Sequence, residues 1–379
     1  MNLIEFGTIS HIKKGKKPLR QVDKPQDGYM PYVDIEAFET GNIKMYTDGE
    51  KCLPCKAGDI LIVCDGSRSG FVGKAIDGYV GSTLAIISAD GMSQEYLYYF
   101  LQGKYALLNT KKKGTGTPHL DANILNQQKL FVPSIEEQKR IVARIEELFS
   151  ELDNGVETLK KTKQQLTVYR QAVLKEAFEK CKTLSPIREM STLVTSGSRG
   201  WAKYYAPQGA KFIRIGNLTR DSIDIDFSDT QYVDLPDKAE GLRSKLQPND
   251  VLVSITADLG SIGLVPNNIG EAYINQHIAV VRFKNAAQGK FMAWYLRSDW
   301  GQKDLLKNKR GAGKLGLGLD DIRDSRVPVV SDEEAESVLN VIESRLSVCD
   351  SIEKTVDTAL QQAEAMRQSI LKKAFEGEL

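Results

Sequence analysis

Apolar residues recur at every seventh position in two long stretches of the chain, residues 134–179 and 331–376. The repeating positions are Ile145, Leu152, Leu159, Leu166 and Val173 in the first stretch and Ile342, Cys349, Val356, Ala363 and Ile370 in the second. Such a repeat places the side chains in one narrow stripe along a helix, and a narrow stripe suits a coiled-coil partner. The pattern therefore predicts two long helices whose stripes cover one another.

The starts of both helices carry capping signals. Ser134 with Glu137, and Ser331 with Glu334, fit the capping box, in which the serine caps the first turn and the glutamate reaches back. No proline interrupts either stretch, so each helix can span about 44 residues, or about 65 Å at a rise of ~1.5 Å per residue. Gly155 is the weak point of the first helix, and we expect a kink there.

The two helices are copies of one another, and so are the segments that precede them. The stretches from Ser134 and from Ser331 align without a gap, and 17 of 46 positions are identical. Short apolar stretches with Gly, Asn and Asp turns, and one aromatic helix, recur ahead of each helix in the same order. The matched segments are 31–35 with 211–215, 53–63 with 246–254, 69–73 with 260–265, 82–87 with 276–281, and 96–101 with 291–296. The chain is therefore an internal repeat.

The repeat predicts the architecture. The expected fold class is α+β: two mixed α/β globules alternate with two long helices, and the helices pair as an antiparallel coiled coil with a pseudo-twofold axis between the halves. We place the first globule at residues 1–133, the central helix at 134–181, the second globule at 182–328 and the C-terminal helix at 329–379.

The net charge of +1, from 51 basic and 50 acidic residues, hides an uneven distribution. Residues 331–379 hold five basic and eleven acidic residues, and residues 136–180 hold nine of each sign, which leaves 37 basic and 30 acidic residues for the rest of the chain. A basic surface suits a polyanion, whereas an acidic helix suits a protein partner better than DNA.

Basic, glycine-rich loops lie at matching places in both halves. Residues 13–17 and 196–201 open the two globules, and residues 111–119 and 307–314 close them. Glycine allows a close backbone approach, cations pair with phosphates, and arginine can also read guanine edges. One loop of this kind is commonly just solvated, but the recurrence favours contact with a nucleic acid. The candidate DNA-binding residues are Lys13, Lys14, Lys16, Lys17, Arg68, Lys112, Lys113, Thr115, Thr117, His119, Ser198, Arg199, Trp201, Lys309, Arg310 and Lys314.

Signatures of a catalytic centre are weak. The run at residues 311–314 is not a phosphate loop, because Asn308 and Leu315 stand where that loop needs glycine and Ser or Thr. The chain has only three histidines, which provides poorly for a His-based hydrolase or metal site. We interpret His277 as a core residue of an apolar strand and His119 as a phosphate contact.

Cysteine use and hydropathy limit the remaining possibilities. Cys52 and Cys55 have zinc-like spacing, but no second pair follows at suitable spacing, so we expect ordinary reduced thiols and no metal. No stretch approaches the roughly 20 apolar residues of a membrane helix. The N-terminus lacks a signal-peptide core, and we therefore expect a cytoplasmic protein with no membrane contact.

These features together resemble the specificity subunit of type I restriction-modification systems. The helix signature carries the resemblance, with VPSIEEQKRIV at 132–142 and RQAVLKEAF at 170–178. The Gly-Thr-Pro-His loop at 116–119 and the Gly-Asp-Ile-Leu run at 58–61 also fit, and the resemblance covers essentially the whole chain. The second half departs from the pattern: Ala-Glu-Ser at 335–337 replaces the Gln-Lys-Arg run, and Gly-Lys-Leu-Gly at 313–316 replaces Thr-Pro-His.

The resemblance implies a non-catalytic subunit that binds double-stranded DNA. Each globule would be a target recognition domain for one half of a bipartite sequence, and the helices would set the spacing and dock two methyltransferase subunits. Those subunits would bind S-adenosylmethionine, and endonuclease/translocase subunits would use ATP and magnesium, so this chain would need no cofactor of its own. Two other interpretations stay open: a coiled-coil scaffold whose globules bind proteins, and a nuclease or modification enzyme with an unfamiliar site.

Overall fold

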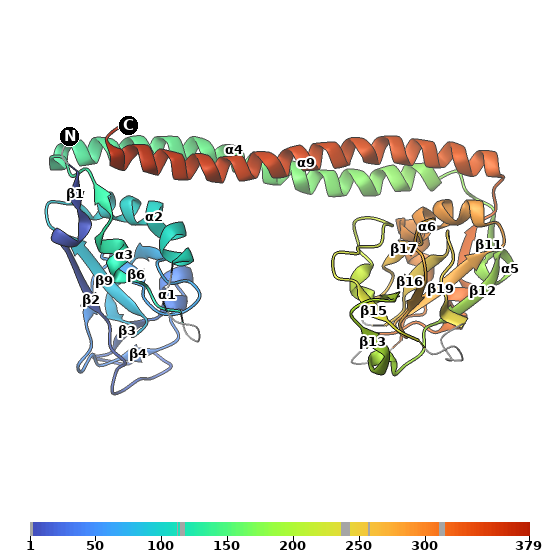
Figure 1. Ribbon diagram of the computed structural model, residues 1–379, viewed down its shortest axis with the longest axis horizontal. Helices are drawn as coiled ribbons and strands as arrows, with labels where there is room; N and C mark the ends of the chain where they lie inside the picture. Colours follow the sequence, from blue (N-terminus) through green and yellow to red (C-terminus); the bar gives the residue numbers. More distant parts are fainter. Residues whose placement is uncertain (1–2, 112, 114–117, 236–242, 257, 311–314) are drawn as a thin grey trace. The chain divides into compact units, whose positions relative to one another are not determined.

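The computed structural model describes residues 3–111, 113, 118–235, 243–256, 258–310 and 315–379 (Figure 1). The chain forms two compact units, one of residues Met1–Lys160 with Asp357–Leu379 and the other of residues Lys161–Val356. Each unit joins one globule to part of both long helices, α4 (Ile135–Phe178) and α9 (Asp332–Glu376). Among the described residues, no helix is long and apolar enough to span a membrane.

Two four-stranded sheets form the globule of the first unit. The first sheet has the order β2-β9-β6-β7 and the second β4-β3-β8-β5. Within them β3 and β8 run parallel, and the other neighbours are antiparallel. The strands are β2 (Ser10–Lys14), β3 (Met30–Val33), β4 (Tyr46–Thr47), β5 (Pro54–Cys55), β6 (Ile60–Val63), β7 (Val72–Lys74), β8 (Gly78–Val80) and β9 (Leu84–Ala89). The remaining elements are β1 (Ile4–Glu5) paired with β10 (Lys129–Leu130), η1 (Phe6–Thr8), α1 (Ile35–Thr40), α2 (Gln94–Thr110) and α3 (Ala122–Asn126).

The second unit repeats this plan. Its sheets have the orders β12-β19-β16-β17 and β13-β15-β14-β18, and β14 and β18 form the one parallel pair among the described strands of this unit. The strands are β12 (Ser191–Ser196), β13 (Tyr205–Ala206), β14 (Ala210–Ile213), β15 (Gln231–Val233), β16 (Val251–Ser254), β17 (Ile262–Leu264), β18 (Ala272–Ile274) and β19 (Ile278–Phe283). The remaining elements are β11 (Leu184–Pro186) paired with β20 (Arg326–Pro328), α5 (Ile187–Met190), η2 (Trp201–Tyr204), η3 (Ile215–Asn217), η5 (Ala286–Gln288), α6 (Gly289–Arg297), α7 (Asp299–Leu305) and α8 (Leu319–Asp324).

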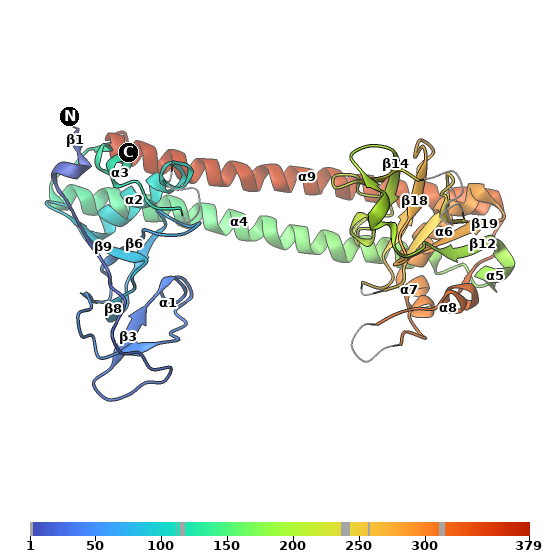
Figure 2. The ribbon, with the colours of Figure 1, turned by 60° about the horizontal axis from the view of Figure 1, so that its bottom comes forward.

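In each unit the predicted aromatic helix packs against a long helix. In the first unit the rings of Tyr96 and Phe100 on α2 lie 4.8 and 5.4 Å from the ring of Phe375 on α9. Figures 1 and 2 show α2 on the side of the globule that faces the long helices. In the second unit α6 packs in the same way against Phe178 on α4, at ring distances of 5.3 and 5.4 Å. The core of each unit therefore includes a long helix, which anchors that helix to its globule.

The long helices pair antiparallel within each unit. In the second unit Arg170 lies 2.7 Å from Asp350, while Glu176, further along α4, lies 2.6 Å from Arg345, earlier in α9. In the first unit Arg367 forms an ion pair with Asp153. Arg367 and Asp153 are the repeat counterparts of Arg170 and Asp350, so the same contact recurs in both units. This confirms the predicted α+β class with two globules and two long, antiparallel helices.

The predicted capping box forms fully at the start of α9 and in part at the start of α4. The capping box of α9 is complete, because Ser331 and Glu334 exchange hydrogen bonds of 2.9 and 3.2 Å. At the start of α4 the Glu137 amide donates to Ser134 Oγ at 3.3 Å, while the Glu137 carboxylate contacts Arg140. Helix α4 runs through Gly155 without interruption, so the weak point expected there does not end the helix.

Candidate nucleic-acid interface

Each basic loop at the end of a globule is closed by a pair of backbone hydrogen bonds. In the first unit Lys113 and His119 exchange N–H···O bonds of 2.8 and 2.9 Å, and in the second Arg310 and Gly316 exchange bonds of 2.8 and 3.0 Å. Lys113 corresponds to Arg310, and His119 to Gly316, in the repeat. Both halves therefore hold a basic loop between two fixed ends.

The far end of each loop is tied to the segment after the central strand of the first sheet. In the first unit His119 pairs with Asp65, just after β6, and in the second Gly316 pairs with Thr256, just after β16. The next residue then donates its amide to the same segment: Leu120 to the Cys64 carbonyl at 2.8 Å, and Leu317 to the Ile255 carbonyl at 2.9 Å. The ends of the two loops therefore make the same backbone contacts, in agreement with the match between the loops in sequence.

Carboxylates at the following short helices hold the basic residue that opens each loop. Lys113 Nζ lies 3.0 Å from Asp121, the N-cap of α3, and Arg310 Nη2 lies 2.9 Å from Asp321 in the first turn of α8. The hydrogen bond from Lys113 holds the pKa of Asp121 below its usual value. These two predicted cations already have partners, so they shape the loops in addition to carrying charge.

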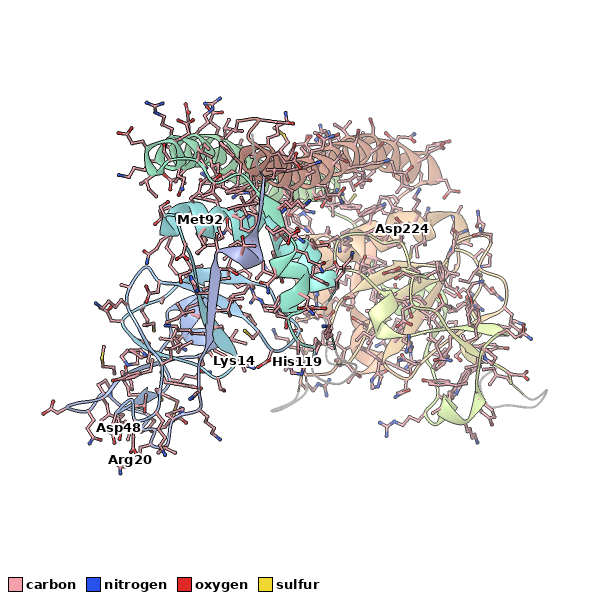
Figure 3. All side chains as sticks on the ribbon, turned by 60° about the vertical axis from the view of Figure 1, so that its left-hand side comes forward. Lys14, Arg20, Asp48, Met92, His119 and Asp224 are labelled. Atoms are coloured by element: carbon pink, nitrogen blue, oxygen red, sulfur yellow. The ribbon has the colours of Figure 1, made fainter. Side chains whose placement is uncertain are left out.

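Asp65 gathers two more of the predicted residues in the first unit. Lys14 Nζ, at the end of β2, lies 2.7 Å from Asp65 Oδ2, and His119 Nδ1 lies 2.7 Å from Asp65 Oδ1. Figure 3 shows Lys14 and His119 beside one another. Burial acts to raise the pKa of Asp65, but the hydrogen bonds from Lys14 and His119 outweigh it, and the pKa lies below its ordinary value. The carboxylate therefore stays charged and clamps the strand end to the loop.

Five other predicted cations have exposed side chains and no partner among the described residues. Lys13, Lys16, Lys17, Arg199 and Lys309 have exposed side chains, and no hydrogen bond or ion pair joins their side chains to another residue in the part of the chain that the structure describes. Lys17 and Arg199 occupy equivalent places, two residues after Gly15 and Gly197. A Cβ at either glycine would lie within 2.3 Å of a backbone oxygen, so glycine is required at both positions and fixes where these loops begin.

Two predicted residues of the second opening loop have internal contacts. Ser198 Oγ accepts a hydrogen bond of 3.5 Å from Arg243. Trp201 is only 5% exposed and stacks on Phe212 at a ring distance of 4.9 Å, with Tyr273 on its other flank. Because the indole is part of the core, little of its surface is free to contact DNA, which argues against the DNA-binding role that we predicted for it.

Some predicted residues cannot be placed, and one histidine differs from expectation. Lys112, Thr115, Thr117 and Lys314 lie outside the described residues. His277 lies one residue before β19, not inside a strand, and is half-buried beside Gln276, whose amide nitrogen is 2.8 Å from His277 Nε2.

The thiols have no feature of a metal site. The five cysteines are free, and burial raises the pKa of Cys55 to about 12 and that of Cys64 to about 11. Within the described ranges no three His, Cys, Asp or Glu side chains lie close enough together to hold a metal ion.

Arg220 is a candidate that the sequence did not single out. In the first unit Arg68, in the segment after β6, forms an ion pair with Glu39 at the end of α1 and lies 4.5 Å above the ring of Phe71. In the second unit the charges are exchanged: Asp258 follows β16, and Arg220 reaches it from the segment after η3, with Nε 3.0 Å from Oδ1. Each unit thus has an arginine in an ion pair beside the segment that follows β6 or β16. A comparison of the two sequences does not show this, because the arginine comes from a different segment in each unit.

Comparisons with known proteins agree with this geometry. A profile of the family described as type I restriction modification DNA specificity domain matches residues 1–167 and 191–362. The EcoBI specificity subunit of a type I restriction enzyme from Escherichia coli is 26% identical over 415 aligned positions, which cover 99% of this chain and 85% of that protein. The MjaVIII specificity subunit from Methanocaldococcus jannaschii is 25% identical over 389 positions, which cover 93% of this chain and 89% of that protein.

Solved structures share the fold. A chain from a study of complex assembly and conformational transition in the type I R-M system has a TM-score of 0.74 at 18% identity and covers 100% of this chain, with 98% of its own length matched. The HsdS subunit from Thermoanaerobacter tengcongensis has a TM-score of 0.53 at 17% identity, with 100% and 97% of the two chains covered. Because the family profile spans most of its length, this chain belongs to the family of type I restriction modification DNA specificity domains.

Proposed function

We propose that this chain reads a bipartite target in double-stranded DNA, one half with each globule, as the non-catalytic specificity subunit of a type I restriction-modification complex. The observation that carries the proposal is the anchored basic loop that recurs in both units, with its far end tied to the segment after β6 or β16. Two copies of one binding element in a single chain suit two separate half-sites. The division into recognition segments at 1–133 and 182–328 and spacer segments at 134–181 and 329–379 is part of this proposal.

Affinity and discrimination come from different residues in this proposal. The exposed, unpaired cations Lys13, Lys16, Lys17, Arg199 and Lys309 pair with phosphates and release counterions, which gives affinity that falls with salt. Discrimination comes from the loops that Asp65, Asp121 and Asp321 hold in place, because only side chains that reach base edges distinguish one sequence from another.

The long helices provide surfaces for the methyltransferase subunits. In the second unit Val341, Val348 and Ile352 leave 44%, 58% and 40% of their surface exposed along one side of α9. In the first unit the seam between α4 and α9 has an open groove of about 330 Å³, lined by residues that include Leu159 and Met366. Exposed apolar area of this kind marks contact with another protein. We assign it to two methyltransferase subunits, which would bind S-adenosylmethionine, while endonuclease/translocase subunits would use ATP and magnesium.

A methylation map tests the proposal. The chain is expressed with the methyltransferase subunit of its own system in a methylation-free host, and the genome is sequenced for modified adenines. We expect a new motif of two short half-sites with a fixed spacer, absent when this chain is omitted. A stable and active complex that gives no new motif, together with DNA affinity that does not depend on salt, would instead favour a protein-binding scaffold.

A further inference from the structure

A pocket in the first unit lies between α2 and the C-terminal end of α9. It encloses about 320 Å³, and its apolar floor includes Phe100, Leu371 and Phe375. Three lysines and one glutamate line the same pocket: Lys104 on α2, Lys129 on β10, and Lys372 and Glu376 on α9. Cavities of this size with an apolar floor and a few charged groups are typical of small-molecule sites.

The three lysines outnumber Glu376, the one carboxylate among the lining residues of this pocket. No hydrogen bond or ion pair joins the ammonium groups of Lys104, Lys129 and Lys372 to another residue in the part of the chain that the structure describes. The Lys104 ammonium lies 5.5 Å from the centre of the Phe100 ring. Burial lowers the pKa of Lys104; the charge of Glu376 opposes this change and that of Lys372 reinforces it. An anion in the pocket would relieve the repulsion among the lysines.

The second unit has an equivalent contact between its aromatic helix and a long helix. Phe178 of α4 is the repeat counterpart of Phe375, and its contact with Tyr295 of α6 corresponds to that of Phe375 with Phe100. Lys175 of α4 is the counterpart of Lys372. The helix that packs against this surface is therefore in the same register in both units.

A tryptophan side chain contacts this part of α4 in the second unit. There the helix is interrupted between α6 and α7 at Ser298, and the indole N–H of Trp300 donates to the carbonyl of Lys175 at 3.4 Å. In the first unit α2 continues without a break to Thr110, and this unit has no tryptophan, because Trp201, Trp294 and Trp300 are the three in the chain. The first unit therefore has no tryptophan that could make the equivalent contact at Lys372.

We propose that this pocket binds a planar aromatic anion. The ring of the ligand lies against Phe100 and Phe375, and its anionic group lies between Lys104 and Lys372. A nucleotide and an aromatic carboxylate share this chemistry. The inference does not depend on the DNA-reading proposal, because the pocket is formed by α2, α9 and β10 and includes none of the candidate DNA-binding residues.

The test uses the full chain and the dye anilinonaphthalene sulfonate, an aromatic anion with a planar naphthalene ring, whose fluorescence rises in apolar sites. We expect Lys104→Gln/Lys372→Gln to lose one dye site, with binding there weaker by about tenfold. The matched control is Lys175→Gln, which changes the counterpart lysine in the second unit and should leave dye binding unchanged. A second variant, Leu107→Trp, fills the pocket without removing charge and should also lose the site.

Competition identifies the source of the ligand. Displacement of the lysine-dependent dye by adenosine monophosphate supports a nucleotide, and displacement by indole acetate alone supports an aromatic carboxylate. The proposal is overturned if the double variant binds dye as the wild type does, or if neither competitor displaces the lysine-dependent dye. Thermal unfolding followed by circular dichroism establishes that each variant is folded.

Discussion

Asp65 brings Lys14 and His119 together in the first unit, and Asp65→Asn removes the charge that they share. The folded pKa of Asp65 is lowered, so its contribution to stability is fully present above the ordinary value of 3.8 and is lost as the pH falls through the lower folded value. We expect the variant to be less stable by about 1–3 kcal/mol at pH 7, and the difference should shrink towards about pH 3. Urea unfolding at both pH values, followed by circular dichroism, measures it; a difference of the same size at low pH would contradict the assignment to charge.

Lys17 and Arg199 are exposed and unpaired at equivalent places in the two units, so they form a matched pair for substitution. We expect Arg199→Ala to change or weaken recognition of the second half-site only, and Lys17→Ala to affect the first half-site only. If the lost contact is to a phosphate, the salt dependence of binding should fall by about 0.9 in log–log slope. Methylation maps and binding titrations of the complex check both, and loss of both half-sites from either substitution would refute independent modules.

The sequence indicated basic residues for the candidate interface but not their partners within the chain. Lys14, Lys113 and Arg310 meet carboxylates of Asp65, Asp121 and Asp321, and these contacts depend on how strands and loops pack. Trp201 was included because it follows a basic loop, yet its packing against Phe212 places it in the core. Arg220 was missed because the arginine and the carboxylate of its ion pair have exchanged segments between the two halves.

At the scale of the elements, the sequence predicted most of the fold, because periodic apolar positions determine which helix faces are buried. Ile145, Val173, Ile342 and Cys349 are each at most 1% exposed. Met366 lies between the repeat positions Ala363 and Ile370 but remains 54% exposed beside the groove between α4 and α9. A seven-residue pattern does not distinguish apolar residues that pack against the paired helix from apolar residues that remain on the surface, because both are the same types of side chain.

The ion pairs between α4 and α9 predict how strongly each part of the helix pair depends on its arginine. Arg170 is 17% exposed and meets both Asp350 and Glu353, whereas Arg367 is 28% exposed and meets Asp153 and the ring of Phe149. We expect Arg170→Ala to destabilise the second unit by about 1–3 kcal/mol, because a partly buried pair loses its cation.

Tryptophan fluorescence during urea unfolding reports on this change, because Trp201, Trp294 and Trp300 all lie in the second unit. The control is Arg188→Ala in the same unit, whose ion pair with Asp324 is 51% and 52% exposed and should contribute only a few tenths of a kcal/mol. Equal effects of the two substitutions would show that the contact between the helices adds nothing beyond an ordinary surface pair.

At the scale of the whole molecule, the proposed function gives recognition to the globules and spacing to the helices. Both long helices carry the seven-residue repeat, and their matched residues differ in number by a constant amount along the whole alignment. A change of helix length that preserves this correspondence must therefore be made in both helices at matching places, for example by deleting residues 156–162 together with residues 353–359. Deletion in one helix alone would keep its apolar stripe in phase but shift one end of the helix pair by seven residues, so that the ion pair of Arg170 with Asp350 and that of Arg367 with Asp153 could not both form.

Deletion of one heptad from both helices shortens each by about 10 Å at ~1.5 Å per residue, which corresponds to about three base pairs at ~3.4 Å each. We expect the methylation map of this variant to show the same two half-sites with a shorter spacer. Binding should also be weaker, because DNA turns by roughly a third of a helical repeat over three base pairs and the half-sites no longer face the globules in the same phase. A folded, active variant that keeps the original spacer would show that the helices do not set the distance, whereas altered half-sites would show that recognition is not confined to the globules.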